Sequence, residues 1–437
     1  MVLAESSVPD QLRTTVRQRQ VILALLAVFF LAGLGWYWNA DGEDLASSFV
    51  GCRLIAAGHA EALFNYDPDN FAGIGPGHLW QDFSKPGGFR GFIHPYVQTP
   101  LWGWGLQPLC THVRWAVFNR LFAALALLCF AGTVWLIARY WTPSLFHPVP
   151  IAVILVGLWF AQPFQYAMFL TQTHALFFFL AVASLILAQK ERPIAAGFLL
   201  ACAAAVKVTP GFLIIYWLLT RRWKATLSFL VWSAVLMVFT IAVVGPHLVA
   251  VYFADLQRIS RVLLVSENNQ SLAAWWMGHY HPEDDVFDVD IFPLPTAVRL
   301  LSMALMVGFT ALGGWIDRRR YSLRHEFSVP GVPIGAVMAL VAVTIFAPIA
   351  WTHYSVILLA PLMVIVEEAR RLRSWVVGIW AALIALLNYR PIATDIIAMD
   401  LGRFAILRGQ FYAGVLCLLA VGWIWWERRR QGALRAS

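Results

Sequence analysis

Long apolar runs separated by short polar stretches recur along the whole chain. Each run approaches the ~20 residues that cross a bilayer as a helix, and we interpret the pattern as about twelve membrane segments. The expected segments are 21–38, 115–137, 149–164, 174–188, two short helices within 194–220, 225–244, 296–316, 332–348, 354–366, 375–388 and 410–426. The pattern therefore predicts an all-α polytopic membrane protein, with residues 1–437 forming a single integral membrane domain.

A proline interrupts the apolar run of residues 194–220. Pro210 fixes its own φ and restricts the residue before it, so we expect two short helices that meet at Lys207-Val208-Thr209-Pro210. Lys207 then lies at helix ends, where an ammonium can meet an anion such as a lipid phosphate. The alternative is a lysine whose charged end snorkels to the membrane interface.

Charge sets the expected orientation. The chain is 60% hydrophobic and only 13% charged, against roughly 25% charged residues in soluble domains. Its net charge of +8 comes from short loops. This distribution does not indicate a nucleic-acid partner. Arginine and lysine occupy every second loop, which the positive-inside rule places in the cytoplasm. We expect a bacterial inner-membrane protein with both termini inside and two long extracytoplasmic loops, 39–114 and 245–295.

The start of the chain and the first outer loop carry further expectations. The first apolar run is too long for a signal-peptide core and lacks a cleavage pattern, which indicates a retained helix. Within the first loop, residues 45–62 predict an amphipathic interfacial helix, and the glycines and prolines of 68–91 predict irregular structure. Residues 100–109 return to the membrane surface with two tryptophans.

Cysteines and acidic residues give weaker indications. Cys52 and Cys110 share the first outer loop, where a disulfide is feasible, but no framework spacing is present and we expect free thiols. The second loop contains an acidic cluster whose oxygen atoms suit a divalent cation, although a solvated acidic loop is the commoner explanation. Its members are Glu283, Asp284, Asp285, Asp288 and Asp290. We expect no metal site and no cofactor.

Three carboxylates stand where the first segment meets water, in Asp41-Gly42-Glu43-Asp44-Leu45. Asp44 is the candidate for a general base at the mouth of a membrane-embedded site. The alternative is a solvated carboxylate that caps the following helix, because aspartate suits a helix N-terminus. By residue type alone, Asp41 or Glu43 serves as well.

Further polar clusters interrupt apolar runs on the outer side. Polar groups at membrane depth are costly, and therefore tend to be functional or paired. His353 lies in such a cluster, residues 347–354, where an interfacial turn is the alternative reading. Gln172 follows several aromatic residues, and Asn269 and Gln270 precede two tryptophans. Amides beside aromatic rings suit sugar binding, although by themselves both stretches are better explained as ordinary loop structure.

Taken in order, short motifs from residue 44 to residue 361 form a characteristic set. They are Asp44-Leu45, Gly58, Leu63-Phe64, Phe92-Ile93-His94-Pro95, Pro100-Leu101, Thr171-Gln172, Ala196-Gly197, Lys207-Val208-Thr209-Pro210, Asn269-Gln270-Ser271-Leu272 and Ala347-Pro348-Ile349-Ala350-Trp351-Thr352-His353-Tyr354. This set resembles glycosyltransferase family 87, of the membrane-embedded GT-C type. The chain departs from the family pattern at Ala347 and Ala350, which replace serines. Thr171 replaces a glycine, and the tyrosine usual shortly after the aspartate is missing from residues 47–49.

The resemblance implies transfer of a hexose, mannose first, from a polyprenyl-phosphate donor to a lipid or glycan acceptor on the extracytoplasmic face. It implies Asp44 and His353 as catalytic residues. The expected substrate-binding residues are Lys207, Gln172, Asn269, Gln270, His94, Trp351 and Tyr354. Rival readings are a transporter or flippase for lipid-linked sugars, a ligase that transfers a whole lipid-linked glycan, and a structural membrane subunit. A transporter of this kind typically shows repeated halves with paired broken helices, and only one break is found.

Overall fold

The computed structural model describes residues 14–64, 78–91, 93–266, 268–277, 290–322, 332–389 and 409–436, and 80% of these residues are helical. Within this described part, 6 helical stretches are long and apolar enough to cross a membrane. They are α1 (Val16–Trp36), α6 (Trp115–Tyr140), α12 (Trp223–Val244), α15 (Thr296–Ser322), α21 (Gly409–Ala436) and the continuous run of η7 (Thr352–Leu358) with α17 (Leu359–Leu372).

Shorter apolar helices stand between the long ones. They are α7 (Pro148–Phe160), α9 (His174–Gln189), α10 (Pro193–Val206), α16 (Ile334–Ile345) and α18 (Trp375–Leu387), with the short η4 (Pro143–Leu145) and α8 (Gln162–Phe169) as connections. An all-α membrane protein is thus confirmed, whereas the count of twelve spans stays a prediction.

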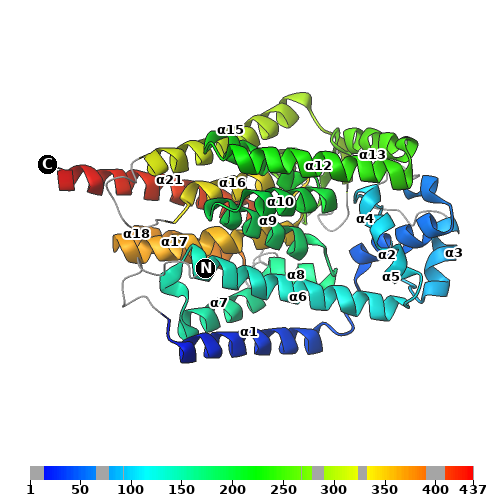
Figure 1. Ribbon diagram of the computed structural model, residues 1–437, viewed down its shortest axis with the longest axis horizontal. Helices are drawn as coiled ribbons and strands as arrows, with labels where there is room; N and C mark the ends of the chain where they lie inside the picture. The colour runs from blue at the N-terminus through cyan, green and yellow to red at the C-terminus, as the bar shows by residue number, and fades with distance from the viewer. Residues whose placement is uncertain are drawn as a thin grey trace.

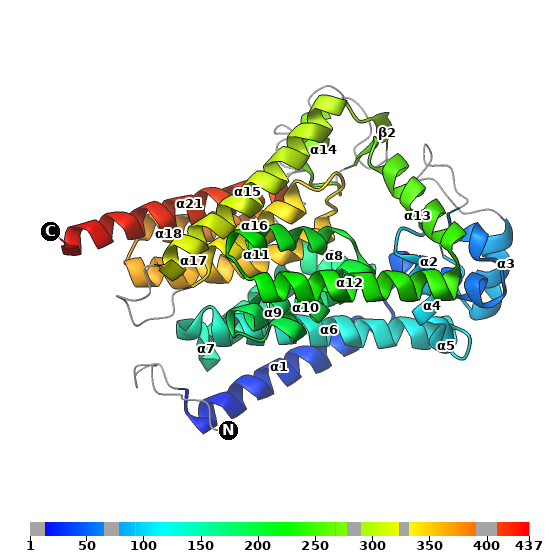
Figure 2. The same ribbon diagram turned by 45° about the horizontal axis from the view of Figure 1, so that its top comes forward.

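The long helices run side by side along the long axis of the molecule (Figures 1 and 2). The helices of the first outer loop gather at one end, together with α13 (Pro246–Ile259). The first turn of α1 and the last turn of α21 lie towards the opposite end in both views. This arrangement separates the molecule into a helical bundle and a cap at one of its ends.

The expected break at Lys207 is present. Helix α10 ends at Val206, Lys207 is extended with φ −149° and ψ 130°, and the chain resumes as η5 (Thr209–Leu213) and α11 (Ile214–Leu219). The Thr99 hydroxyl donates to the Ala205 carbonyl, one of the carbonyls that a helix end leaves without an intrahelical partner. The break therefore puts Lys207 beside the loop that precedes α4.

Close packing inside the bundle depends on small residues and one buried carboxylate. A Cβ on Gly313 of α15 would lie 2.3 Å from the carbonyl oxygen of Gly335, which opens α16, so neither position has room for a side chain. Asp317 on α15 accepts hydrogen bonds from the backbone N–H groups of Gly335 and Ala336 and from the Tyr216 hydroxyl. This carboxylate satisfies the first N–H groups of α16 and fixes α11 against α15.

The first outer loop folds into a small core of its own. Its elements are α2 (Glu43–Ala56), η2 (Ala60–Phe64), α3 (His78–Gly87), α4 (Pro100–Gly105) and α5 (Gln107–Cys110). Helix α2 ends earlier than the expected 45–62 and is buried on most of its surface, so its placement at the membrane interface stays a prediction. The core around it contains Phe49, Trp80 and Tyr96.

Two expectations about this loop were wrong. Residues 78–87 form helix α3, because Trp80 packs into the core and its indole N–H donates to the Ala62 carbonyl at 3.1 Å. Cys52 and Cys110 form a disulfide, because α2 and α5 pack together and bring the two Cα atoms within 6.5 Å. Neither contact can be predicted from the local spacing of residue types, since the partners lie 18 and 58 residues apart in the sequence.

The second outer loop contains α13, α14 (Leu272–Met277) and a short antiparallel pair, β1 (Val262–Val265) and β2 (Asp290–Pro293). The pairing register sets Val262 opposite Pro293. Residues 283–288 of the acidic cluster, and the side chain of Asp290, lie outside the described residues. Strand β2 leads directly into the start of α15.

Candidate active site

A polar pocket of about 170 Å³ lies where the cap meets the bundle. Its walls come from the start of α2, the loop before α4, the segment between α8 and α9, the break at Lys207, the turn after β1, and η7. Of the expected site residues, the structure brings seven to this pocket: Asp44, His94, Gln172, Lys207, Trp351, His353 and Tyr354. Their sequence positions span more than 300 residues, so this convergence is a property of the fold.

Asp44 faces the pocket and contacts a histidine. Gly42 is the N-cap of α2 with φ +66°, so the helix starts after a left-handed residue and Asp44 lies in the first turn. The Asp44 Oδ1 lies 3.3 Å from Nε2 of His94, and Oε2 of Glu43 lies 3.7 Å from the same nitrogen. Asp44 is only 20% exposed, and is therefore placed as a pocket carboxylate rather than a solvated one.

Burial raises the pKa of Asp44, because removing a carboxylate from water disfavours its charged form, and the neighbouring His94 and Lys207 oppose this effect only in part. Burial acts to lower the pKa of His94, but the carboxylates of Glu43 and Asp44 outweigh it and raise the pKa. The carboxyl group and the imidazole of this pair therefore both bind a proton more tightly than they do in water.

Lys207 lies on the other side of the pocket among aromatic and imidazole rings. Its ammonium donates to the Tyr354 hydroxyl, lies 3.8 Å from the centre of the Tyr354 ring and is 3.4 Å from Nε2 of His174. His174 in turn contacts Oε1 of Gln172 through Nδ1 at 3.0 Å and stacks on Tyr354 with ring centres 3.9 Å apart. Lys207 is thus held inside the pocket by named partners, which disfavours the snorkelling alternative.

His353 is 2% exposed, and neither of its ring nitrogens has a hydrogen-bond partner among the described residues. Its ring packs against His174 and Tyr354, with centres 4.6 and 4.8 Å away. A buried polar group without a partner is costly. An imidazole held this way at the wall of a polar pocket is available to a bound ligand, and it is His94, not His353, that contacts Asp44.

Asn269 and Gln270 have a different place from the one expected. Both are buried outside the pocket lining, where Asn268 and Ser266 stand instead. The Asn269 Oδ1 accepts from the N–H groups of Ala350 and Ser271, and its amide donates to the Leu264 carbonyl. The Gln270 N–H donates to the Ala350 carbonyl at 2.5 Å. The motif clamps the segment that leads into η7, and so positions His353 and Tyr354.

Several lining residues were not in the expected site, among them Tyr166, His174 and Asn268. His174 was open to detection, because it lies two residues after Gln172 at the start of an apolar helix, where an imidazole is uncommon. Tyr166 and Asn268 sit in aromatic and amide clusters whose other members point elsewhere. Only the fold distinguishes which member of each cluster reaches the pocket.

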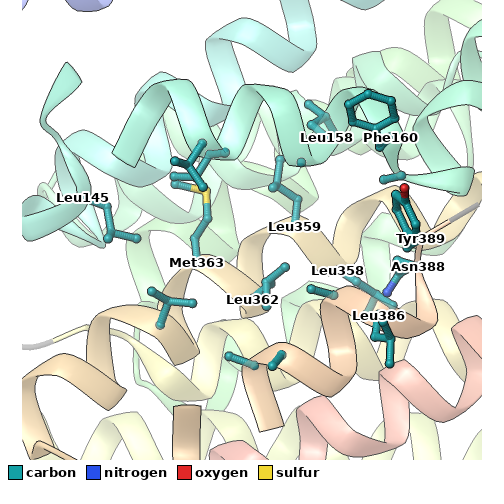
Figure 3. Close-up of a pocket in the computed structure, with 18 of the residues that line it drawn as sticks. Leu145, Leu158, Phe160, Leu358, Leu359, Leu362, Met363, Leu386, Asn388 and Tyr389 are labelled. Carbon is teal, nitrogen blue, oxygen red and sulfur yellow. The ribbon is translucent and has the colours of Figure 1, made fainter. Parts of the chain in front are cut away.

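A second, larger cavity of about 960 Å³ lies between α7, α17 and α18 and is lined almost wholly by apolar side chains. Figure 3 shows Leu359, Leu362 and Met363 projecting from α17 into it, with Asn388 and Tyr389 at one end. It shares α8 and η7 with the polar pocket. Ser355 of η7 lines the apolar cavity, whereas its neighbour Tyr354 lines the polar pocket.

A family model described as glycosyltransferase family 87 matches residues 96–323, which is more than half of the chain. This chain belongs to glycosyltransferase family 87. It is therefore an enzyme that transfers a sugar from a donor to an acceptor, which sets aside the transporter and structural-subunit readings. The match includes Gln172, Lys207, Asn269 and Gln270 of this family 87 chain, while Asp44, His94 and His353 lie outside the matched range. Comparison with curated proteins and with solved structures gave no match.

Proposed function

We propose that this family 87 glycosyltransferase has the GT-C architecture and transfers a hexose, with mannose as the first candidate, from a polyprenyl-phosphate donor to a lipid or glycan acceptor at the extracytoplasmic face. The observation that carries the proposal is the polar pocket, which combines the Asp44 carboxylate, the Lys207 ammonium and three imidazoles at the edge of a membrane bundle. The reaction needs each of these chemical types.

Asp44 acts as general base. The acceptor hydroxyl loses its proton to an Asp44 oxygen as its own oxygen bonds the anomeric carbon. The bond from that carbon to the phosphate oxygen breaks and leaves its electron pair on the phosphate. A positioned base contributes about 10²- to 10⁴-fold to such a step. The raised pKa of Asp44 strengthens it as a proton acceptor. His353, whose ring nitrogens are without partners among the described residues, is the second candidate for this proton transfer.

Lys207 holds the donor phosphate. A fixed ammonium in a partly buried pocket stabilises the charge that collects on the leaving phosphate. Tyr354 and His174 hold the lysine end in place from two sides. Gln172, which contacts His174, and Trp351 complete the wall that faces the sugar.

The apolar cavity supports a lipid-linked donor. Most of its lining residues are apolar, so it has the surface that a hydrocarbon chain requires. It lies next to the polar pocket, and η7 contributes residues to both. A donor whose isoprenoid chain lies in this cavity presents its phosphate to the polar pocket. The disulfide between Cys52 and Cys110 supports an extracytoplasmic cap, because disulfides persist in oxidising compartments.

Asp44→Asn tests this proposal. The variant keeps the shape of the side chain and removes the base, so we expect turnover to fall by about 10²- to 10⁴-fold. The purified protein is incubated with polyprenyl-phosphate mannose and a panel of membrane glycolipids, and the products are identified by mass spectrometry. Addition of one hexose to an acceptor identifies a transferase of single sugars.

The matched control is Glu61→Gln, an exposed carboxylate in the same outer loop. It should leave turnover unchanged. Undiminished turnover in the Asp44→Asn variant removes the base assignment, and absence of transfer by the parent enzyme from this donor removes the donor assignment.

A further inference from the structure

A third pocket, of about 330 Å³, lies beside the segment that carries Asp44 and is lined by its neighbours Asp41 and Glu43. Its principal lining residues are Trp38, Asp41, Glu43, Arg90, Asn119 and Arg120. They come from the end of α1, the start of α2, the loop after α3, and the first turns of α6. The mechanism above uses none of them, so their gathering around one cavity calls for a separate explanation.

Asn119 provides the first indication that this pocket holds a ligand. It is only 4% exposed, and its amide nitrogen donates to the Ala40 carbonyl at 2.6 Å, which fixes the orientation of the side chain. Its Oδ1 has no hydrogen-bond partner among the described residues. A buried amide oxygen normally accepts at least one hydrogen bond, so a ligand hydroxyl in the pocket fits this position.

The walls have the composition that a sugar requires. Arg120 stacks over the Trp38 ring at 4.3 Å, and its guanidinium donates to the Trp38 carbonyl and to Asn39 Oδ1, so these contacts hold the indole at the pocket wall. A fixed aromatic face packs against the C–H groups of a sugar ring, while carboxylates and guanidinium groups bond its hydroxyls. Polar and apolar surface thus alternate within one small cavity.

Charge favours a neutral ligand. Asp41 and Glu43 contribute two negative charges and Arg90 and Arg120 two positive ones, so the lining is balanced. The polar pocket with Lys207 is the better site for a phosphate. The two pockets meet at one side-chain pair, because Glu43 lines this pocket and lies 3.7 Å from His94, which lines the polar pocket. Glu43 and Asp44 are consecutive residues that face different pockets.

We propose that the pocket of Trp38, Asn119 and Arg120 binds the neutral, polyhydroxylated head group of the acceptor. This inference rests on the proposed function: a sugar held here extends a neighbouring hydroxyl across the Glu43–His94 pair towards Asp44. Donor and acceptor then approach the general base from opposite sides of one short backbone segment.

The test separates acceptor binding from donor binding. Octyl α-mannoside serves as the acceptor and polyprenyl-phosphate mannose as the donor. Trp38→Ala and Arg120→Gln should each raise the acceptor KM by roughly tenfold, the loss expected for one good contact, and leave the donor KM within about twofold. Trp36→Ala and Arg114→Gln are matched controls, since both residues are exposed, lie at the end of α1 and just before α6, and do not line the pocket.

Variants that change the acceptor KM no more than their controls overturn the inference, as do variants that raise both KM values together. A binding experiment keeps the inference testable if the proposed donor is wrong. Octyl α-mannoside is titrated calorimetrically into the enzyme without donor, and Trp38→Ala should weaken its binding by roughly tenfold. Equal binding by enzyme and variant, or tighter binding of octyl phosphate than of octyl mannoside, argues for another ligand.

Discussion

At the residue scale, the turn between α8 and α9 places an unusual demand on one position. Thr171 is buried and has φ +48°, in the left-handed region that favours glycine. The motif resemblance had marked this residue as a departure from a Gly-Gln pair, and the backbone explains why glycine suits the position. The next residue, Gln172, lines the polar pocket, so the strained turn sits directly before a residue of the candidate site.

The contact between His94 and Asp44 predicts a pH effect. His94 opposes the rise in the pKa of Asp44 that burial causes. His94→Gln removes that opposition, so the pKa of Asp44 should rise further. Because only the deprotonated carboxylate accepts a proton, the acid limb of the kcat/KM profile should move to higher pH. The measurement is the pH dependence of kcat/KM, with His112→Gln, an exposed histidine of the same loop, as the control. An acid limb that stays in place, or moves to lower pH, contradicts the assignment.

At the element scale, two devices hold the short helices around the pocket. The Asn269 clamp ties the turn after β1 to the segment before η7, through hydrogen bonds to Ala350 and Leu264. The disulfide ties α2, which carries Asp44, to α5 at the entrance to α6. The short elements of the cap thus depend on cross-links between distant parts of the chain for their mutual placement.

The disulfide should contribute strongly to the stability of the cap. Joining cysteines 58 residues apart removes chain entropy from the unfolded state, worth about 4 kcal/mol for a loop of this length. Cys52→Ala combined with Cys110→Ala should therefore lower the midpoint of thermal inactivation. Reductant should lower the midpoint of the parent protein but leave the double variant unchanged. Cys129→Ala, at a free buried cysteine, is the control. A parent midpoint that is insensitive to reductant contradicts this contribution.

At the scale of the whole molecule, charge and architecture support the same orientation. The cap gathers at one end of the bundle, opposite the first turn of α1 and the last turn of α21 (Figure 2). The arginines of α17 and α21 form buried ion pairs away from the cap, where Arg371 pairs with Glu367 and Arg428 with Glu368. The first pair lies within α17, and the second joins α21 to α17 at the end that the positive-inside rule assigns to the cytoplasm.

Cysteine labelling tests this orientation. His247 is exposed at the start of α13, and Arg192 is exposed in the short loop before α10. His247→Cys should react with a membrane-impermeant maleimide on intact cells, and Arg192→Cys only after the membrane is opened. The parent protein supplies the background. The reverse labelling pattern would place the candidate site on the cytoplasmic face.

Hydrophobic patterning determined most of the secondary structure in the bundle, because membrane helices are set by local apolar length and satisfy their own backbone hydrogen bonds. The break at Lys207 followed from Pro210 for the same local reason. The structure of the cap was harder to predict from the sequence, because α3 and the disulfide depend on packing between segments far apart in sequence. The family also followed from the sequence, since the order of its motifs along the chain can be recognised without knowing which residues are in contact.

Only the tertiary structure decided which polar residues share a cavity. It brought Asp44, His94, Lys207 and His353 to one pocket and gave Asn269 a clamping place outside it. Sequence cannot supply this distinction, because a side chain that faces a pocket and one that anchors a turn share residue type and local spacing. They differ only in what the folded chain places opposite them.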